Sequence, residues 1–243
     1  MTKSVIITGV NGGIGKALSG AFSDNGYTTI GLDIVHDDSN CDYFIPIDLN
    51  RFASDTEYRI EKSHKILELS SELEVLINNA AIQLLDDTSN IKEGDWFKTL
   101  NINLSSPFFL SQLCFDSLKK NKGSIINIAS IHAKQTKRNF VAYATSKAAL
   151  EGLTRAMAID TQGTIRVNAI SPAAIETKML KDGFKGKEEL LDQLKSFHPS
   201  QAIGTTEEVA RLALFLSDKK NAFLNGSVIS LDGAISSVLH DPD

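Results

Sequence analysis

The chain has 243 residues, of which 42% are hydrophobic and 23% charged, enough for one compact domain with a sizeable core. Its net charge of −5 disfavours nucleic acid as a partner, and no apolar run is long enough for a bilayer, so no membrane contact is expected. Two cysteines, Cys41 and Cys114, predict reduced thiols rather than a disulfide framework, and the lack of a leader sequence predicts a cytoplasmic protein.

Seven short apolar segments alternate with helical patterns along the chain, beginning near residues 4, 28, 43, 74, 124, 164 and 227. This alternation predicts an α/β fold in which a doubly wound parallel sheet carries helices on both faces. No repeat, low-complexity tract or proline-rich linker interrupts the pattern, so residues 1–243 are expected to form a single domain. Ligands of such sheets bind beyond the carboxyl ends of the strands.

The first apolar segment leads into a glycine-rich turn and then into a helical pattern from Lys16 to Asn25; the turn reads Thr8-Gly9-Val10-Asn11-Gly12-Gly13-Ile14-Gly15. Glycines let the backbone approach a pyrophosphate, and the amino end of the following helix favours its negative charge. A glycine pattern alone can be an ordinary turn, but strand, turn and helix in this order predict a dinucleotide site. The expected contacts are Gly9, Asn11, Gly13, Ile14 and Gly15.

The second apolar segment ends at Asp33, eighteen residues after Gly15, where dinucleotide folds place an acid for the adenosine ribose. A carboxylate accepts hydrogen bonds from the ribose hydroxyls of NAD and repels the 2'-phosphate of NADP. Between Gly15 and Arg51 the sequence has a single lysine or arginine, Lys16, so a partner for that phosphate is hard to find locally. We therefore expect NAD, with NADP less favoured; the alternative is that Asp33 is a solvated acid after a strand.

A candidate proton-transfer site follows the fifth apolar segment. Ser130 ends that segment, and thirteen residues later Tyr143 opens the sequence Tyr-Ala-Thr-Ser-Lys, which ends at Lys147. Positions i and i+4 of a helix share a face, so the phenol and the ammonium should enter one cleft. We expect the ammonium to lower the pKa of Tyr143 from about 10 toward working pH and so to make it a general acid or base. Taken alone, this spacing also occurs on surface helices.

These motifs together resemble the classical short-chain dehydrogenase/reductase family over nearly the whole chain, from about Ser4 to about Ala234. Further motifs in the order of the family are Asp48-Leu49, Asn78-Asn79-Ala80, Asn103 in Asn-Leu-Ser-Ser-Pro-Phe, and Ile125-Ile126-Asn127-Ile128-Ala129-Ser130. The resemblance implies a Rossmann fold and an NAD-dependent oxidoreductase that interconverts a secondary alcohol and a carbonyl by hydride transfer. It also suggests a homotetramer, and it implies no metal.

The resemblance assigns a role to each candidate residue. Tyr143 would exchange the proton with the substrate oxygen, and Ser130 would hydrogen-bond the same oxygen. Lys147 would bind the nicotinamide ribose and lower the pKa of Tyr143, while Asn103 would hold a water that links Lys147 to solvent. Further cofactor contacts implied by the family, from adenine to carboxamide, are Asp48, Leu49, Asn79, Ala80, Pro172, Ile175 and Thr177.

The sequence departs from the family pattern at three positions where glycine is usual. Alanine stands at Ala81, Ala173 and Ala234. A methyl group at Ala81 or Ala173 would narrow the space near the cofactor, so we expect an effect on cofactor affinity or pose rather than on the chemistry.

Residues 178–202 break the regular rhythm of the chain. They include Gly183, Gly186 and an amphipathic stretch from Glu188 to Phe197. The resemblance implies a substrate lid here, and glycines would let such a flap open and close. A solvated pair of surface helices is the alternative.

The substrate is suggested by two polar residues at family positions that face the reacting carbon, Gln83 and His132. The pair is similar to that of 3-hydroxybutyrate dehydrogenases, although Phe140 stands where that group usually has a lysine. A small hydroxy acid is therefore one expectation, and a sugar, a polyol or a 3-oxoacyl-type substrate is the alternative. An NAD-binding regulator without turnover is disfavoured, because the four candidate catalytic residues are intact.

Overall fold

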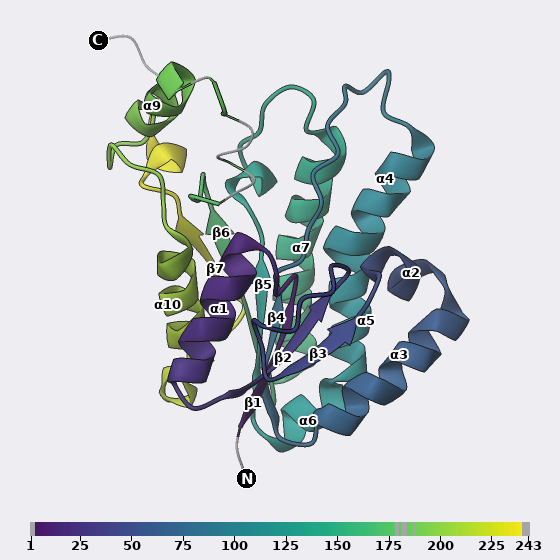
Figure 1. Cartoon of the computed structure of the whole chain (residues 1–243). Helices are drawn as coiled ribbons and strands as arrows, with labels where there is room; N and C mark the ends of the chain where they lie inside the picture. Colours follow the sequence, from purple (N-terminus) through teal and green to yellow (C-terminus); the bar gives the residue numbers. More distant parts are fainter. Residues whose placement is uncertain (1–2, 178–179, 181–183, 187, 240–243) are drawn as a thin grey trace.

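The computed structural model describes residues 3–177, 180, 184–186 and 188–239. Within them, seven strands form one sheet in the order β3-β2-β1-β4-β5-β6-β7, and every pairing is parallel (Figure 1). The strands are β1 (Ser4–Thr8), β2 (Thr28–Asp33), β3 (Tyr43–Pro46), β4 (Leu73–Asn78), β5 (Ser124–Ile128), β6 (Arg166–Pro172) and β7 (Val228–Leu231). The predicted doubly wound sheet is confirmed. The strand order reverses between β1 and β4, which is where such folds open a ligand crevice.

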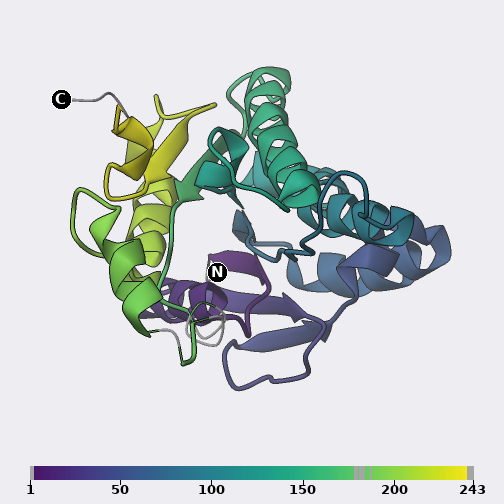
Figure 2. The same cartoon turned by 90° about the horizontal axis from the view of Figure 1, so that it is seen from above.

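Helices cover both faces of the sheet (Figure 2). On one face, α1 (Gly13–Asp24) packs beside α10 (Thr206–Ser217) over a shared apolar core. On the other face, a second core lies under α3, α5, α6 and α7. The remaining helices are α2 (Leu49–Ser54), α3 (Thr56–Leu69), α4 (Glu93–Leu100), the π-helix η1 (Asn101–Ser105), α5 (Ser106–Leu113), α6 (Phe115–Lys120), the 3-10 turn η2 (Ile131–Ala133), α7 (Val141–Asp160), α9 (Glu188–Ser196) and the 3-10 turns η3 (Lys219–Asn221) and η4 (Ile235–Ser237).

Strand β1 explains why the apolar segments of the sequence are continuous rather than alternating. Ile6 belongs to the core under α3 and α5, whereas Val5 and Ile7 belong to the core under α1 and α10. Successive side chains of a strand point to opposite faces, and here both faces are covered by helices. Each inner strand must therefore be apolar on both sides.

Both cysteines are free thiols, as predicted. Complete burial raises the pKa of Cys114 to about 12, so this thiol is inert at neutral pH. In the described ranges, none of the helices has the length and apolar character that crossing a membrane requires. No group of three or more potential metal-ligating His, Cys, Asp or Glu side chains gathers in the same ranges.

The polar motifs of the sequence follow the carboxyl ends of adjacent strands, at the upper edge of the sheet in Figure 1. Gly9 comes directly after β1, Asp33 ends β2 and Asp48 follows β3. Asn79 comes directly after β4, and Ser130 lies two residues beyond β5. Since parallel strands all end at the same edge, the fold brings together residues that are about 120 positions apart in the chain.

Candidate active site

Ser130 and Tyr143 meet at the amino end of α7. Ser130 precedes the 3-10 turn η2, and its hydroxyl accepts a hydrogen bond from the backbone N–H of His132 at 3.2 Å. Tyr143 lies in the first turn of α7, with its phenol hydrogen-bonded to the Ser130 side chain. The thirteen-residue separation is thus bridged by η2 and a short loop, and the two hydroxyl groups face each other.

Lys147 lies one turn after Tyr143 on the same face of α7, as predicted, and only 2% of it is exposed. Its Nζ donates a hydrogen bond to the carbonyl oxygen of Ile128 at 2.7 Å and lies 5.7 Å from the centroid of the Tyr143 ring. Burial lowers the pKa of Lys147 to about 8, because one carbonyl dipole does not replace the water that the ammonium has lost.

The expectation that Lys147 lowers the pKa of Tyr143 is wrong for this structure. Burial raises the pKa of the Tyr143 phenol, and the hydrogen bond with Ser130 offsets only part of this effect. The ammonium of Lys147 is bonded to the end of β5 instead, so removal from water outweighs charge stabilisation at the phenol. At neutral pH, Tyr143 is therefore a neutral phenol that can donate a proton.

Asn103 is buried in the π-helix η1 and clamps the loop after β4. Its Oδ1 accepts from the N–H of Ile82 at 2.9 Å, and its Nδ2 donates to the carbonyl oxygen of Ile82 at 3.0 Å. Pro107, four residues later, has no N–H for the carbonyl of Asn103, so the ordinary α-helical bond cannot form and the wider π register occurs here. The second lone pair of Oδ1 is what the side chain has left for the predicted water.

Ser146 completes this cluster and was missed by the sequence reasoning. The second hydrogen of Asn103 Nδ2 goes to Ser146 Oγ at 3.0 Å, and Ser146 Oγ donates to the carbonyl of Tyr143 at 2.7 Å. Ser146 is fully buried and so connects η1 to the first turn of α7. The signal was present, because Ser146 lies inside the Tyr-Ala-Thr-Ser-Lys motif next to Lys147, but its partner Asn103 is 43 residues away.

The glycine turn after β1, called the glycine cradle below, packs so closely that Gly9, Gly13 and Gly15 have little or no room for a side chain. Gly9 has a φ of +67°, and a methyl group there would lie 3.0 Å from the Cα of Ala80. A methyl group at Gly15 would collide with the carbonyl of Gly9, and one at Gly13 would lie 3.2 Å from the methyl carbon of Thr177. Glycine is therefore required by the packing of the turn itself, and the turn leads into the amino end of α1, where a pyrophosphate would be favoured.

Asn79 and Ala80 support this turn from the neighbouring strand. The Asn79 side chain donates to the carbonyls of Thr8 and Gly9 at 2.9 and 3.1 Å. The backbone N–H groups of Asn79 and Ala80 both donate to Thr8 Oγ1 at 2.9 Å. Asn79 and Ala80, predicted as adenosine contacts, thus also hold the glycine turn in shape.

Asp33 lies at the end of β2, beside the glycine turn. Its Oδ2 accepts from the N–H of Asn11 at 3.0 Å, and its Oδ1 accepts from the N–H of Val35 at 3.0 Å. Asn11 Nδ2 also donates to the carbonyl oxygen of Val35 at 2.8 Å. The carboxylate is therefore fixed in place and is not a freely solvated acid.

The remaining predicted cofactor residues lie around this cradle. Asp48 caps α2, with Oδ1 accepting from Asn50 N at 2.8 Å, and Leu49 is buried behind it. Ile14 packs on the edge of the core under α1. On the far side, β6 ends at Pro172, Ile175 is buried and bridges to Gly204, and Thr177 contacts Gly13.

His132 lies beside the candidate catalytic group, whereas Gln83 is exposed. The His132 ring stacks on Phe140 with centroids 4.4 Å apart and meets the edge of Tyr143 at 5.8 Å. Its Nδ1 lies 3.1 Å from Thr136 Oγ1, and burial together with the charge of Lys137 lowers its pKa. His132 is therefore a neutral imidazole at neutral pH.

The predicted lid falls partly outside the described residues, which exclude 178–179, 181–183 and 187, and with them Gly183. Within the described part, α9 carries the exposed Leu190 and is followed by the exposed Phe197. Gly186 has a φ of +73°. Of the three departures from glycine, Ala234 alone adopts a left-handed backbone, with a φ of +68°.

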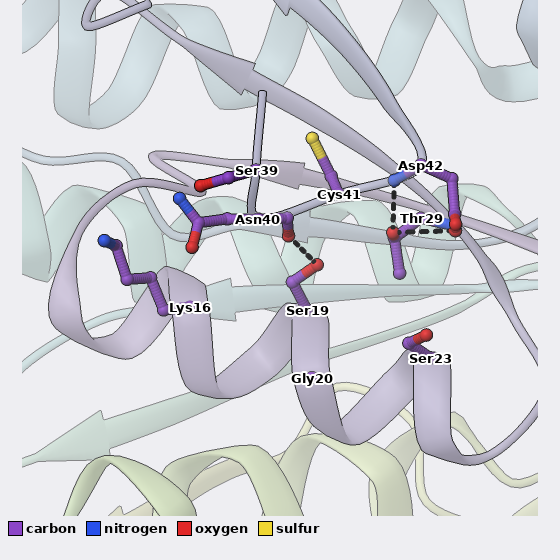
Figure 3. Close-up of a pocket in the computed structure, with 9 residues that line it drawn as sticks. All are labelled: Lys16, Ser19, Gly20, Ser23, Thr29, Ser39, Asn40, Cys41 and Asp42. Atoms are coloured by element: carbon purple, nitrogen blue, oxygen red, sulfur yellow. Dashed lines mark hydrogen bonds between the residues drawn. The ribbon is translucent and has the colours of Figure 1, made fainter. Parts of the chain in front are cut away.

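A polar pocket of about 370 Å³ lies behind the loop that connects β2 to β3, between that loop and α1 (Figure 3). Lys16 lies at one end of it, with Nζ 4.0 Å from Asp37 Oδ2. The pKa of Asp37 is held below its usual value by hydrogen bonds from Ser39. Lys16, the one lysine or arginine between Gly15 and Arg51, therefore already lies next to the ionised carboxylate of Asp37.

Comparisons with known proteins agree on the class of the chain. Residues 9–236 match a family profile described as enoyl-(acyl carrier protein) reductase. The chain is similar to the NAD-dependent glycerol dehydrogenase of Listeria innocua, with 31% identity over 240 residues that cover 95% of this chain and 92% of the relative.

Two solved structures share the whole fold. The ligand-free aldohexose dehydrogenase of Thermoplasma acidophilum has a TM-score of 0.90 and 30% identity, covering 100% of this chain and 97% of its own. ElxO with NADP bound has a TM-score of 0.88 and 31% identity, covering 98% of this chain and 100% of its own.

Proposed function

The chain belongs to the classical short-chain dehydrogenase/reductase family, whose members act on CH–OH groups, and from this premise we propose that it interconverts a small polar secondary alcohol and its carbonyl with NAD. The observation that carries the proposal is the cluster of Ser130, Tyr143, Lys147 and Asn103 at the carboxyl ends of β4 and β5. The cluster lies at the sheet edge that also holds the glycine cradle.

In the proposed mechanism, the nicotinamide, when bound, gives or takes the hydride. Tyr143, neutral in this structure, donates its phenolic proton to the carbonyl oxygen in the direction of reduction, and it accepts the proton as phenolate in oxidation. Ser130, hydrogen-bonded to the phenol, orients the substrate oxygen. Lys147 has a pKa near neutrality, so it can pass a proton on toward solvent. Asn103 holds the first turn of α7 in place through Ser146.

The residues present fit a dinucleotide. Gly9 and Gly15 let the chain turn tightly into the amino end of α1, and Asp33 is held beside this turn by two backbone N–H groups. We propose NAD rather than NADP, because Asp33 and the ionised Asp37 repel a phosphate and the nearby Lys16 is already beside Asp37. The NAD-dependent glycerol dehydrogenase supports this choice, and the NADP complex of ElxO is the counterexample.

The substrate we favour is a polyol or sugar. A neutral His132 beside Tyr143 can hydrogen-bond a hydroxyl group but supplies no charge for a carboxylate. The glycerol and aldohexose dehydrogenases support this choice. A small hydroxy acid such as 3-hydroxybutyrate is the second candidate, because Lys137 lies 4.9 Å from the Phe140 ring and brings a cation near the cleft. A 3-oxoacyl substrate is the third, and the description of the family profile supports it.

His132 and Gln83 provide the test of substrate class. We expect His132→Ala and Gln83→Ala to raise KM for the preferred substrate several-fold more than for a plain secondary alcohol such as 2-butanol. Steady-state kinetics at saturating NAD measures this difference. Equal effects on both alcohols would remove these residues from the substrate site.

We also propose that the chain forms a homotetramer in the cytoplasm and that residues 178–202 act as its substrate lid. Phe97 on α4, Phe108 on α5 and Ile159 on α7 are exposed apolar side chains on one helical layer, which supports association through that layer. Free thiols fit a reducing compartment. Light scattering of the purified protein tests the assembly, and a monomer would contradict it.

The first experiment is absorbance at the NADH band with polyols, sugars, hydroxy acids and acyl thioesters, in both directions and with both nucleotides. Turnover of polyols with NAD and no turnover by Tyr143→Phe is the expected result. Absence of any turnover with either nucleotide, together with absence of nucleotide binding, would contradict the proposal.

A further inference from the structure

Asn40, in the connection between β2 and β3, joins this connection to the glycine turn and to α1. Its Nδ2 donates to Asn11 Oδ1 at 2.9 Å and to Asp37 Oδ2 at 3.0 Å. Its carbonyl oxygen accepts a hydrogen bond from Ser19 Oγ on α1, drawn as a dashed line in Figure 3. Asn40 is half-buried and belongs to none of the motifs of the sequence.

The contact with Asn11 reaches the proposed cofactor site. Asn11 donates its backbone N–H to Asp33 Oδ2 and its side-chain Nδ2 to the carbonyl of Val35. With Nδ2 committed to Val35, the Oδ1 of Asn11 must face a donor, and Asn40 Nδ2 is that donor. Asn40 therefore fixes which way the Asn11 amide is turned and holds the glycine turn against the loop after β2.

We propose that Asn40 is a positioning residue for the dinucleotide, setting its affinity through Asn11 and Asp33 without touching the substrate. The inference rests on the proposed function, since it assumes that the nucleotide ribose lies at Asp33. A side chain that donates is required at position 40, because both partners, Asn11 Oδ1 and Asp37 Oδ2, are acceptors. An aspartate of the same shape would instead face a carboxylate and a carbonyl oxygen.

Ser19 and Ser23 give a graded set of variants. Both serines lie on the same face of α1 and line the pocket of Figure 3. Ser19 holds the carbonyl of Asn40, whereas Ser23 is exposed and its hydroxyl makes no hydrogen bond within the described residues. Ser23→Ala is therefore a matched control for Ser19→Ala.

The experiment measures the Kd for NADH by fluorescence titration of the full-length protein, together with kcat, both KM values and the melting temperature. We expect Asn40→Ala and Asn40→Asp to raise the Kd for NADH about tenfold, because Asn11 and Asp33 would then have to be ordered when the nucleotide binds. Ser19→Ala should raise it about threefold and Ser23→Ala should leave it unchanged. The kcat at saturating NAD and the KM for the alcohol should stay within about twofold of the wild type.

An unchanged Kd in folded Asn40→Ala would overturn the inference, as would a fall in kcat with no change in Kd. If Asn40→Ala does not fold, Ser19→Ala decides, and equal Kd values for Ser19→Ala and Ser23→Ala would overturn the inference. A wild-type protein that binds neither NADH nor NADPH would overturn the proposed function itself, and this inference with it. A wild type that binds NADH while Asn40→Ala binds it equally well would overturn the positioning role alone.

Discussion

The two ends of the candidate site are built in different ways. Around Tyr143, the polar groups of Ser130, Asn103, Ser146 and Lys147 are buried, and each is held by a partner from another element of the fold. Around Asp33, which ends β2, the groups are only partly buried and lie in or next to connecting loops, where they hold one another by hydrogen bonds.

The contrast indicates which property each end controls. A buried polar group that loses its partner cannot turn to water, so changes near Tyr143 should affect both the chemistry and the stability of the fold. An exposed group can be replaced by water at little cost. Changes near Asp33 should therefore affect nucleotide affinity and leave stability and kcat almost unaltered.

The largest effect is expected at Tyr143. Tyr143→Phe removes the proton donor but keeps the ring beside His132, so kcat should fall about 100- to 10,000-fold while the Kd for NADH stays within about twofold. Stopped-flow absorbance and fluorescence titration measure the two quantities. A variant with wild-type turnover would refute the proposed mechanism.

Lys147→Met should abolish activity and yet stabilise the fold. The fall of the Lys147 pKa from 10.5 to about 8 means that the buried ammonium lowers the free energy of unfolding at pH 7 by about 3 kcal/mol. Losing the hydrogen bond to the Ile128 carbonyl costs about 1 kcal/mol, so Lys147→Met should raise the free energy of unfolding by about 2 kcal/mol.

The gain should depend on pH in a defined direction. Between about pH 8 and pH 10.5, the folded protein binds fewer protons at Lys147 than the unfolded chain does, so wild-type stability rises with pH in this window. The advantage of Lys147→Met should shrink accordingly. Urea unfolding at pH 7 and pH 10 measures it, and a gain that grows with pH would contradict the buried-lysine interpretation.

Ser146→Ala should show both effects of the buried end at once. The variant leaves one N–H of Asn103 without a partner in the interior, which should lower the free energy of unfolding by about 1–3 kcal/mol. We expect kcat to fall about tenfold with little change in KM for NAD, because the first turn of α7 loses its tie to η1. Ser146→Cys, which can still accept weakly, should be intermediate. An effect on KM alone would separate Ser146 from the catalytic cluster.

At the exposed end, Asp33→Asn should change nucleotide choice and little else. Removing the charge should weaken NADH binding about tenfold and strengthen NADPH binding. The melting temperature should fall by about 2–4 °C, because the amide has one acceptor oxygen for the two backbone N–H groups that Asp33 holds. Asp38→Asn, the same change at an exposed acid of the same loop, is the matched control. If the control shifts nucleotide preference as much as Asp33→Asn, general charge repulsion rather than Asp33 decides the cofactor.

The sequence predicted the fold, and it predicted those residues of the buried cluster around Tyr143 that belong to a recognisable motif. Seven apolar segments gave the parallel sheet, and the four-residue spacing of Tyr143 and Lys147 predicted a shared helix face, which is confirmed. The expected direction of the Tyr143 pKa was wrong, because burial depth depends on the packing of α7 against β5 and η1. The spacing of Tyr143 and Lys147 along one helix does not indicate how deeply Tyr143 is buried.

The sequence also did not predict which residues meet across long separations in the chain. Asn103 meets Ser146, and Asn40 meets Asn11, across 43 and 29 residues of chain. The first pair joins two motifs, and the second joins a motif to the connection between β2 and β3, so no local pattern marks either contact. The nucleotide preference, the substrate class and the lid remain predictions.

The π-helix at Asn101–Ser105 has a consequence for how this gene can change in length. A π turn holds one more residue than an α turn, so it absorbs that residue locally while α4 and α5 continue on either side of it. The wide turn thus acts as a retained insertion, protected by Pro107 and by the partners of Asn103. Deleting one residue between α4 and α5 should therefore move Asn103 away from Ile82 and Ser146, which is a larger disturbance than a single substitution on the exposed side of α4.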